Sequence, residues 1–337
     1  MKIAIISVSN KGLKIAFNLK KLLDKESTII KTDLYHKDVK NTFKLIFSEY
    51  DAVIAIMASG ILIRSIAPLI NSKDKDPAII NIDDNGQFVI STLSGHLGGA
   101  NSLTSKIAEL LNATAVITTS TDVNKKLGID VLARDLYLKI NDTSEILYFN
   151  KAILDNQKIK FILNPNRNYD YLFRYLKNNT LEINVSYFYS DKINCDEIHV
   201  VVNEHEIILK EKKLVVGIGC KKNKSSREIF DAVINSLDKL NLSSSRVNYL
   251  SSASIKKDEK GILDLSNDLN IPVYFVSMDK MKLFENNNVS KSEFVKSKFG
   301  IYGVCEPAAL ITAGFESKLI FKKTSYNGVT IAISVSD

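Results

Sequence analysis

Residues 87–119 read QFVISTLSGHLGGANSLTSKIAELLNATAVITT, and their pattern indicates the class of fold. QFVIST and TAVITT are short runs rich in β-branched and aromatic residues, which is typical of strands. Between them, ANSLTSKIAELLN (residues 100–112) repeats apolar residues at helical spacing. The stretch therefore predicts a strand, a tight turn, a helix and a second strand.

The chain before this stretch alternates in the same way. The apolar runs predict strands at residues 2–8, 27–32, 51–57 and 78–82, and the amphipathic runs predict helices at 11–25, 39–50 and 61–70. Pro68 lies inside the last of these helices and is expected to kink or shorten it. Strands separated by helices indicate a mainly parallel, doubly wound sheet covered on both faces. We assign residues 1–121 to this N-terminal α/β domain.

The middle of the chain has a different composition. Residues 122–212 are rich in Asn, Asp, Tyr and Lys, and their predicted strands, at 159–163, 182–189, 197–202 and 205–210, outnumber their clear helices. We expect a smaller α+β domain here.

The α/β alternation resumes at residue 213. Strands are predicted at 213–220, 246–252 and 272–277, and helices at 225–240, 258–269 and 305–314. Residues 318–336 end the chain with two apolar runs around a Tyr-Asn-Gly turn, a strong hairpin signal. The predicted fold class is thus α/β, with doubly wound, mainly parallel sheet domains at both ends, the second spanning residues 213–337.

Composition narrows the class of protein. Hydrophobic residues make up 45% and charged residues 25% of the 337 residues, as in an ordinary globular chain of two or three domains. No apolar run approaches the roughly 20 residues of a membrane span, and the first residues do not resemble a signal peptide. We therefore expect a cytoplasmic protein with no membrane partner.

Cysteine usage and charge indicate the kind of partner. The three cysteines are far apart and form no CxxC pair, so neither a zinc site nor a disulfide framework is predicted. The net charge is +7, which favours an anionic partner. Because the chain has no tryptophan, no arginine-rich block and no aromatic RNA-binding signature, we expect an anionic small molecule and no nucleic acid.

The turn of the opening stretch is the first candidate site. Gly98 and Gly99 allow close backbone approach at a helix start, where free N–H groups attract an anion or a developing oxyanion. His96 is the side chain best suited to exchange a proton near neutral pH. Ser94 and Asn101 add hydrogen-bonding groups. The alternative is a purely structural tight turn.

Two further turns carry cations. In MASGILIRSIAPL (residues 57–69), Arg64 lies about one turn beyond Gly60 and could pair bidentately with a carboxylate, or could simply be a solvated side chain. In VVGIGCKKNKSS (residues 215–226), a strand leads into a turn with Lys221 and Lys222, which either receives an anion or is a solvated lysine cluster. Neither a Walker motif nor a complete G-x-G-x-x-G fingerprint is present there.

A last helix start, YGVCEPAAL (residues 302–310), contains Cys305 and Glu306. No histidine lies in residues 213–337 to activate Cys305 as a nucleophile, so we expect it to be buried in packing and regard Glu306 as the more interesting residue. The remaining histidines, His36, His199 and His205, lack metal-ligand spacing and are expected to be structural or exposed.

Taken together, these stretches resemble the CbiG family of cobalamin biosynthesis. The resemblance rests on GILIRSIAPL, DKDPAIINIDDNGQFVIS, SGHLGGAN, TTSTDVN, GIGCKKN and GVCEPAAL, which occur in the family's order over about the first and last 125 residues. It implies a cobalt-precorrin-5A hydrolase, which opens the ring A δ-lactone of a cobalt-corrinoid with water and releases C20 with its methyl group as acetaldehyde. The cobalt arrives in the substrate, so the resemblance implies no cofactor and no metal bound by the protein.

The resemblance and the chemistry of these residues together suggest their roles. We expect His96, Ser94 and Glu306 to be catalytic, with His96 activating water and later shuttling a proton, and backbone N–H groups of residues 98–101 stabilising the oxyanion. The expected substrate-binding residues are Arg64, Gly95, Gly98, Gly99, Asn101, Lys221 and Lys222.

Some alternatives stay open. Family members commonly have Arg and Gly after the Gly-Ile-Gly-Cys turn, where this chain has Lys221 and Lys222, and lysine cannot grip a carboxylate bidentately. A non-catalytic corrinoid carrier, or an enzyme that binds a sugar phosphate or nucleotide, would use similar turns. The sequence leaves the oligomeric state open, with a homodimer as one option.

Overall fold

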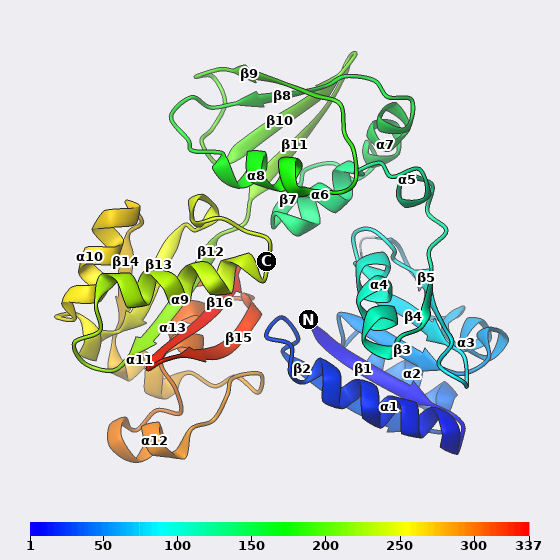
Figure 1. Cartoon of the computed structure of the whole chain (residues 1–337), viewed down its shortest axis with the longest axis horizontal. Helices are drawn as coiled ribbons and strands as arrows, with labels where there is room; N and C mark the ends of the chain where they lie inside the picture. Colours follow the sequence, from blue (N-terminus) through cyan, green and yellow to red (C-terminus); the bar gives the residue numbers. More distant parts are fainter. Residues whose placement is uncertain (74, 337) are drawn as a thin grey trace. The chain divides into compact units, whose positions relative to one another are not determined.

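The computed structural model describes residues 1–73 and 75–336, with all of their side chains except that of Phe294. It contains three sheets, shown with their helices in Figure 1. Its α/β class, with mostly parallel strands in the first and last sheets, confirms the predicted fold class. Among the described residues, no helix has the length and apolar character needed to cross a membrane.

The chain forms two compact units. The first contains Met1–Arg134, Lys139–Asn164 and Asn179–Lys210, and the second contains Asp135–Leu138, Pro165–Asn178 and the chain from Glu211 onward. Each unit draws on residues 122–212, so the three-domain division at residues 121 and 212 stays a prediction.

The first sheet has the strand order β2-β1-β3-β4-β5-β6. Its strands are β1 (Lys2–Ser7), β2 (Lys31–His36), β3 (Ala52–Ile56), β4 (Ala78–Ile82), β5 (Phe88–Leu93) and β6 (Thr114–Val116). Strands β1 to β4 run parallel, β5 runs antiparallel to β4, and β6 runs parallel to β5. The carboxyl end of β5 therefore lies beside the amino end of β4, where Leu93 pairs with Ile79.

The reversal at β5 has a local cause in the loop between β4 and β5. Gly86 adopts φ +69°, a left-handed conformation that favours glycine, and the Asp83 carboxylate accepts hydrogen bonds from the backbone N–H groups of Asn85, Gln87 and Phe88. Asn-Gly between two apolar runs is a hairpin signal, so the antiparallel pairing of β4 and β5 was predictable from the sequence although it was not predicted above.

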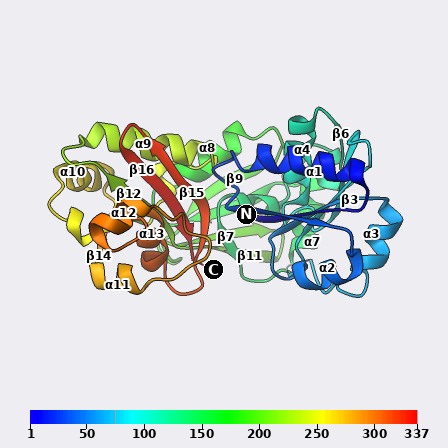
Figure 2. The same cartoon turned by 90° about the horizontal axis from the view of Figure 1, so that it is seen from below.

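Helices cover both faces of this sheet, as Figure 2 shows. One face packs against α1 (Asn10–Leu23) and α4 (Ala100–Leu111), whose Leu19 and Ile107 belong to the same core cluster as Ile54. The other face packs against α2 (Val39–Ile46) and α3 (Ser59–Ile66), whose Phe43 and Leu62 cluster with Val53. Each face of the sheet is thus covered by its own pair of helices.

Several predicted elements have shifted bounds, and two of them lie in the first sheet and its helices. The strand predicted at residues 27–32 is β2 (Lys31–His36). The apolar residues Ile29 and Ile30 precede the strand. Ile29 is buried in the core, and the Ile30 N–H donates to the Met1 carbonyl. The helix predicted at residues 61–70 begins at Ser59 and ends at Ile66, two residues before Pro68, which has no backbone N–H to continue the helical hydrogen bonds.

The second sheet has the order β7-β11-β10-β8-β9. Its strands are β7 (Leu138–Ile140), β8 (Ile159–Leu163), β9 (Val185–Tyr189), β10 (Glu197–Val202) and β11 (His205–Glu211). The helices of this part of the chain are α5 (Ser120–Val123), α6 (Ile129–Asp135), α7 (Ile146–Leu154) and α8 (Asp170–Asn178). Short helices with few polar positions, such as α7, gave too little pattern to be recognised in the sequence.

The third sheet has the order β14-β13-β12-β16-β15. Three parallel strands, β12 (Leu214–Cys220), β13 (Tyr249–Ala253) and β14 (Val273–Val276), are joined to the antiparallel pair β15 (Lys318–Tyr326) and β16 (Val329–Val335). Asn327 (φ +44°) and Gly328 (φ +87°) form the turn of that pair, so the predicted closing hairpin is confirmed.

The helices of this sheet also lie on both faces (Figure 2). They are α9 (Ser226–Asp238), α10 (Lys260–Leu269), α11 (Met278–Leu283), α12 (Glu293–Phe299) and α13 (Cys305–Ala313), with one-turn 3-10 helices at Ser244–Arg246 and Ser254–Lys256. A Cβ on Gly217 of β12 would lie 1.9 Å from the Cys305 carbonyl oxygen, so the start of α13 packs against the strand backbone at a distance only glycine allows.

Candidate active site

The turn between β5 and α4 lies at the amino end of β4. Because β5 is antiparallel to β4, the backbone of this turn comes close to Ala78, the first residue of β4, with 3.4 Å between the Ala78 nitrogen and the place of a Cβ on Gly98. The turn is thus at the opposite edge of the sheet from the carboxyl ends of β1 to β4. Its neighbours there are α5 and α6.

The glycines give the turn its shape. A Cβ on Gly98 would lie 2.5 Å from the Ser94 Cβ, and one on Gly95 would lie 2.7 Å from the Asn101 Oδ1. Gly99 has φ +84° and precedes the first residue of α4. The close approach expected from the glycines is therefore made by the turn's own residues.

The backbone N–H groups of the turn are largely used within it. The N–H groups of Gly99, Ala100 and Asn101 donate to the carbonyls of His96, Ser94 and Gly95, at 3.0, 3.1 and 3.1 Å. In this conformation these three groups are not available to an oxyanion. The oxyanion site expected at residues 98–101 would need the turn to open.

Ser94 is enclosed by the same turn. It adopts φ +55°, unusual for a serine, and its Oγ is buried with no hydrogen-bond partner among the described residues. Its Cβ faces Gly98 within the same turn. We therefore leave Ser94 out of the catalytic group proposed below.

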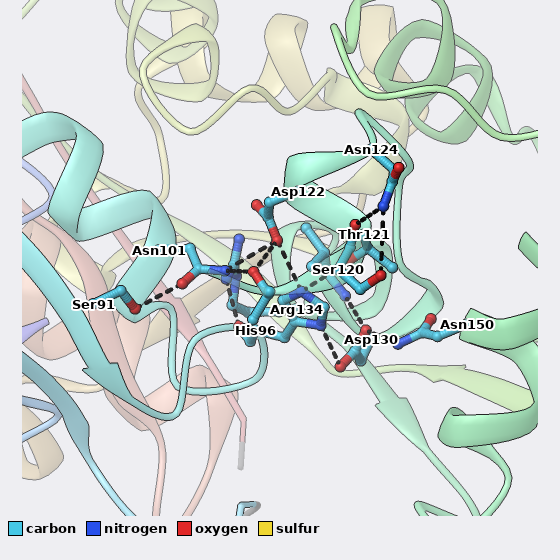
Figure 3. Close-up of polar contacts among 12 residues, drawn as sticks. Ser91, His96, Asn101, Ser120, Thr121, Asp122, Asn124, Asp130, Arg134 and Asn150 are labelled. Atoms are coloured by element: carbon cyan, nitrogen blue, oxygen red, sulfur yellow. Dashed lines mark hydrogen bonds and ion pairs between the residues drawn. The ribbon is translucent and has the colours of Figure 1, made fainter. Parts of the chain in front are cut away.

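His96 lies between two carboxylates, as Figure 3 shows. Its Nε2 is 2.9 Å from Oδ2 of Asp122 in α5, and its Nδ1 is 3.1 Å from Oδ2 of Asp130 in α6. The Thr121 hydroxyl is also 2.9 Å from Nε2. Both ring nitrogens thus face oxygen atoms, an arrangement that the doubly protonated imidazolium satisfies best.

The pKa values of the three residues reflect this pairing. Burial alone lowers the pKa of His96, but hydrogen bonds and charge from Asp122 and Asp130 outweigh it and raise the pKa from 6.5 to about 9. Burial favours neutral carboxyl groups, yet the hydrogen bond and charge of His96 leave the pKa of Asp122 and that of Asp130 below their usual range. At neutral pH the group is therefore a cation between two anions.

Surrounding polar side chains hold the carboxylates in place. Asn101 donates to Asp122 Oδ2 at 3.0 Å and accepts from the Ser91 hydroxyl, and the Thr119 hydroxyl donates to the same carboxylate at 2.7 Å. Asn150 of α7 donates to Asp130 Oδ1 at 3.0 Å. The orientation of both carboxylates is thus fixed from more than one side.

The backbone of His96 is held as well, because an Arg134 guanidinium N–H donates to its carbonyl oxygen. The three acid–base side chains differ in exposure. His96 exposes 15% of its side chain, Asp122 23% and Asp130 7%. Solvent therefore reaches the His96–Asp122 side of the group, while Asp130 is internal.

This arrangement defines a proton donor. An imidazolium with a pKa of about 9 is protonated at neutral pH and can give a proton to an oxygen that becomes basic during a reaction. It cannot accept one until it has lost its own. The role of water-activating base, expected for His96 from the sequence, is therefore less suited to the ground state than that of acid.

Asp122 and Asp130 were not singled out in the sequence. A signal for Asp122 was present, since TTSTDVN (residues 118–124) follows a strand and contains the polar residues typical of a site loop. Asp130 lies in IDVLARD at the start of a short helix, where an acidic residue is usual for reasons of helix stability. Only the folded chain brings it to His96.

Arg64 is not brought to His96. It is exposed on α3, on the α2 and α3 face of the sheet, and its guanidinium folds back over Gly60 beside the carboxyl end of β3. His96 lies at the other edge and leads into α4 on the other face. The two residues therefore do not share a site.

Lys221 and Lys222 belong to the second unit. Both are exposed in the loop that follows the carboxyl end of β12, and the Lys221 N–H donates to the Gly328 carbonyl at 2.9 Å. Their side chains are open to an anionic ligand, so their substrate-binding role stays a prediction.

Glu306 is a buried structural carboxylate. It accepts hydrogen bonds from the Ser290 N–H and hydroxyl, at 2.7 and 3.1 Å, and from the Lys323 N–H at 2.9 Å. Only 1% of the residue is exposed. Since its oxygens already serve to tie α13 to two other segments, we also leave Glu306 out of the catalytic group.

Cys305 is buried, and burial raises the pKa of its thiol to about 12, so it is inert and packs as expected. His199 and His205 pair with Glu206 and Glu145, each at 2.8 Å, and His36 bonds to Ser7. Over residues 1–73 and 75–336, no cluster of His, Cys, Asp and Glu suited to a metal ion is found.

Comparison with known proteins identifies the family. A family model described as "Cobalamin synthesis G N-terminal" matches residues 41–122, and one described as "Cobalamin synthesis G C-terminus" matches residues 214–334. A protein of Methanocaldococcus jannaschii named "Probable cobalt-precorrin-5A hydrolase" is 34% identical, over 100% of both chains. The chain belongs to the CbiG family.

Other CbiG relatives are similar over most of their length. The cobalt-precorrin-5A hydrolase of Salmonella typhimurium is 30% identical over 88% of this chain and 85% of its own. A crystal structure described as a putative cobalamin biosynthesis protein G homolog from Sulfolobus solfataricus matches with a TM-score of 0.62 and 28% identity, covering 100% of this chain and 97% of that one. The CbiG resemblance of the sequence is thus confirmed.

Proposed function

We propose that this chain is a cobalt-precorrin-5A hydrolase of anaerobic cobalamin biosynthesis. It opens the ring A δ-lactone with water and releases C20 with its methyl group as acetaldehyde, giving cobalt-precorrin-5B. The names of the CbiG relatives support the reaction. The structural observation that carries the proposal is His96 held between Asp122 and Asp130.

The first step is lactone opening. The oxygen of water bonds to the acyl carbon of the ring A acetate, the acyl carbon–oxygen bond breaks, and the departing C20 oxygen takes a proton. His96 donates that proton from its imidazolium. The new carboxyl group stays on ring A as a carboxylate, and the proton lost by water passes to solvent. Asp122 and Asp130 keep the His96 imidazole ring oriented throughout.

The second step is carbon–carbon cleavage. His96, now neutral, takes back the proton of the C20 hydroxyl as the bond between C20 and the macrocycle breaks. C20 becomes the aldehyde carbon, and the electron pair of the broken bond enters the conjugated macrocycle, which takes up a proton from solvent. One histidine thus serves as acid and then as base.

The remaining features of the proposal concern binding. The cobalt is part of the substrate, and the enzyme uses no cofactor of its own. Lys221 and Lys222 of the second unit attract the peripheral carboxylates. The protein works in the cytoplasm, and a homodimer, which light scattering would detect, is consistent with the proposal.

The test is anaerobic incubation of the protein with cobalt-precorrin-5A while acetaldehyde is trapped and measured. Wild type should release acetaldehyde, and His96→Gln should release it roughly 10² to 10⁴ times more slowly. His36→Gln, which changes a histidine at the other edge of the sheet, should keep wild-type turnover. Substrate binding without acetaldehyde release by wild type would instead indicate a carrier.

A further inference from the structure

A pocket lies between α2 and α3, on the face of the first sheet opposite α1 and α4. Its volume is about 310 Å³, and it is lined by Lys40, Lys44, Ile61, Arg64, Ser65, Pro68 and Leu69. None of the contacts that support His96 is made by these residues. The mechanism proposed above does not use this pocket.

The lining follows from helix spacing. Lys40 and Lys44 lie four residues apart in α2, and Ile61 and Ser65 lie four residues apart in α3, so each pair shares one face of its helix. Figure 2 shows α2 and α3 on the same side of the sheet, and both pack into one core cluster. The pocket is therefore formed between the facing sides of two neighbouring helices.

The three cations of the pocket lie close to other positive charge. Lys40 lies in the first turn of α2, near the positive end of its helix dipole. Arg64 belongs to the last turn of α3, but its guanidinium folds back over Gly60 in the first turn. Lys44, in the last turn of α2, adds a like charge one turn from Lys40. An anion bound among them would relieve this repulsion.

No carboxylate in the described part of the chain forms an ion pair with these cations. The first turns of α2 and α3 contain no acidic residue. Asp38, the N-cap of α2, accepts hydrogen bonds from Asn41 at 3.0 and 3.2 Å. The positive charge of the pocket is thus available to a ligand.

The pocket also has an apolar side. Ile61 is 37% exposed, and Pro68 and Leu69 complete this surface. A volume of about 310 Å³ is near the lower end of ligand pockets, enough for one substituted ring and its short side chains. A bare inorganic anion would leave the apolar surface uncovered.

From these observations we infer that the α2–α3 pocket binds carboxylates carried on an apolar ring, such as one ring edge of a carboxylate-bearing corrinoid. Arg64 pairs with a carboxylate, Lys40 and Lys44 supply further charge, and Ile61, Pro68 and Leu69 contact the ring. This is a second binding site, separate from His96, and the choice of a corrinoid as its ligand rests on the proposed function.

The test is hydrogen exchange of the full-length protein with four probes: cobyrinic acid, whose side chains are free acids, the amide corrinoid cobinamide, tricarballylate and inorganic phosphate. Cobyrinic acid should protect residues 39–46 and 59–69. Cobinamide, which lacks the acids, should not. The two small anions distinguish ring-borne carboxylates from any free anion.

Variants then tie the protection to the pocket. Lys44→Gln/Arg64→Gln should weaken cobyrinic acid binding in these segments roughly tenfold or more, since each lost charge-assisted bond is worth at least about 1.5 kcal/mol. Lys14→Gln/Lys21→Gln on α1 removes the same charge from the other face and should change nothing there. Equal protection by phosphate or tricarballylate, or protection that survives the pocket variant, would overturn the inference.

Discussion

Nε2 of His96 lies 2.9 Å from Oδ2 of Asp122, which joins the turn before α4 to α5, 26 residues further along the chain. The same ring meets Asp130 through its other nitrogen. A histidine with one carboxylate partner can present its free nitrogen as a base, but one with two carboxylates retains both protons. The pairing therefore determines which chemistry His96 performs first.

Activity should fall as the pH rises through about 9. His96 acts as an acid in the first step, and its pKa of about 9 means that the reactive protonated form is lost above that value. The pH dependence of kcat/KM, measured from acetaldehyde release, should show this basic limb. A rate that instead rises through pH 9 would identify His96 as the first-step base.

Asp130→Asn should move that basic limb to lower pH. Removing one of the two carboxylates takes away part of the stabilisation of the imidazolium, so the pKa of His96 should fall toward 6.5. Nuclear magnetic resonance titration of the His96 ring gives the pKa directly. A purely structural role for Asp130 would lower the amount of folded enzyme and leave both the titration and the limb in place.

Protein stability should depend on the charge of His96. Its pKa is higher in the folded than in the unfolded chain, so its contribution is fully present below about pH 6.5 and is lost as the pH rises through about 9. The difference corresponds to on the order of 3 kcal/mol of unfolding free energy. Urea unfolding at pH 6 and pH 9.5 should show the loss in wild type and a smaller one in His96→Gln.

Glu306→Gln should destabilise the protein without acting on the chemistry. The amide NH2 would replace one of the two carboxylate oxygens and would place its donors against either the Ser290 or the Lys323 N–H group, at a cost of about 1 to 3 kcal/mol. Thermal unfolding should report this, with the exposed Glu285→Gln as control. If the folded variant lost turnover by 10²-fold or more, Glu306 would return to the catalytic group.

Gly217→Ala should be more damaging than most glycine substitutions. Its Cβ would meet the Cys305 carbonyl at 1.9 Å, backbone that cannot move without shifting α13. We expect a loss of about 3 kcal/mol or failure to fold. Gly303→Ala, whose Cβ would lie 3.7 Å from its nearest neighbour, is the matched control in expression and unfolding assays.

Several features of the site could be predicted from the sequence, because they are local. The glycines, histidine and asparagine of residues 94–101 indicate a turn before a helix, and the structure has one there. Arg64 and Lys221 were predicted from residue type and position after a strand, and Glu306 from its place at a helix start. Turns that follow parallel strands all lie at the same edge of the sheet. Because β5 is antiparallel to β4, the turn of His96 lies at the opposite edge from Arg64.

Periodicity, turn residues and motifs are properties of neighbouring residues, so the α/β class, most of the strands and helices, the closing hairpin and the CbiG family could be predicted from the chain alone. Three features became visible in the folded chain: His96 lies between Asp122 and Asp130, the backbone N–H groups of its turn are already bonded, and Glu306 is internal. These depend on strand direction and on contacts between distant segments, which local pattern does not encode.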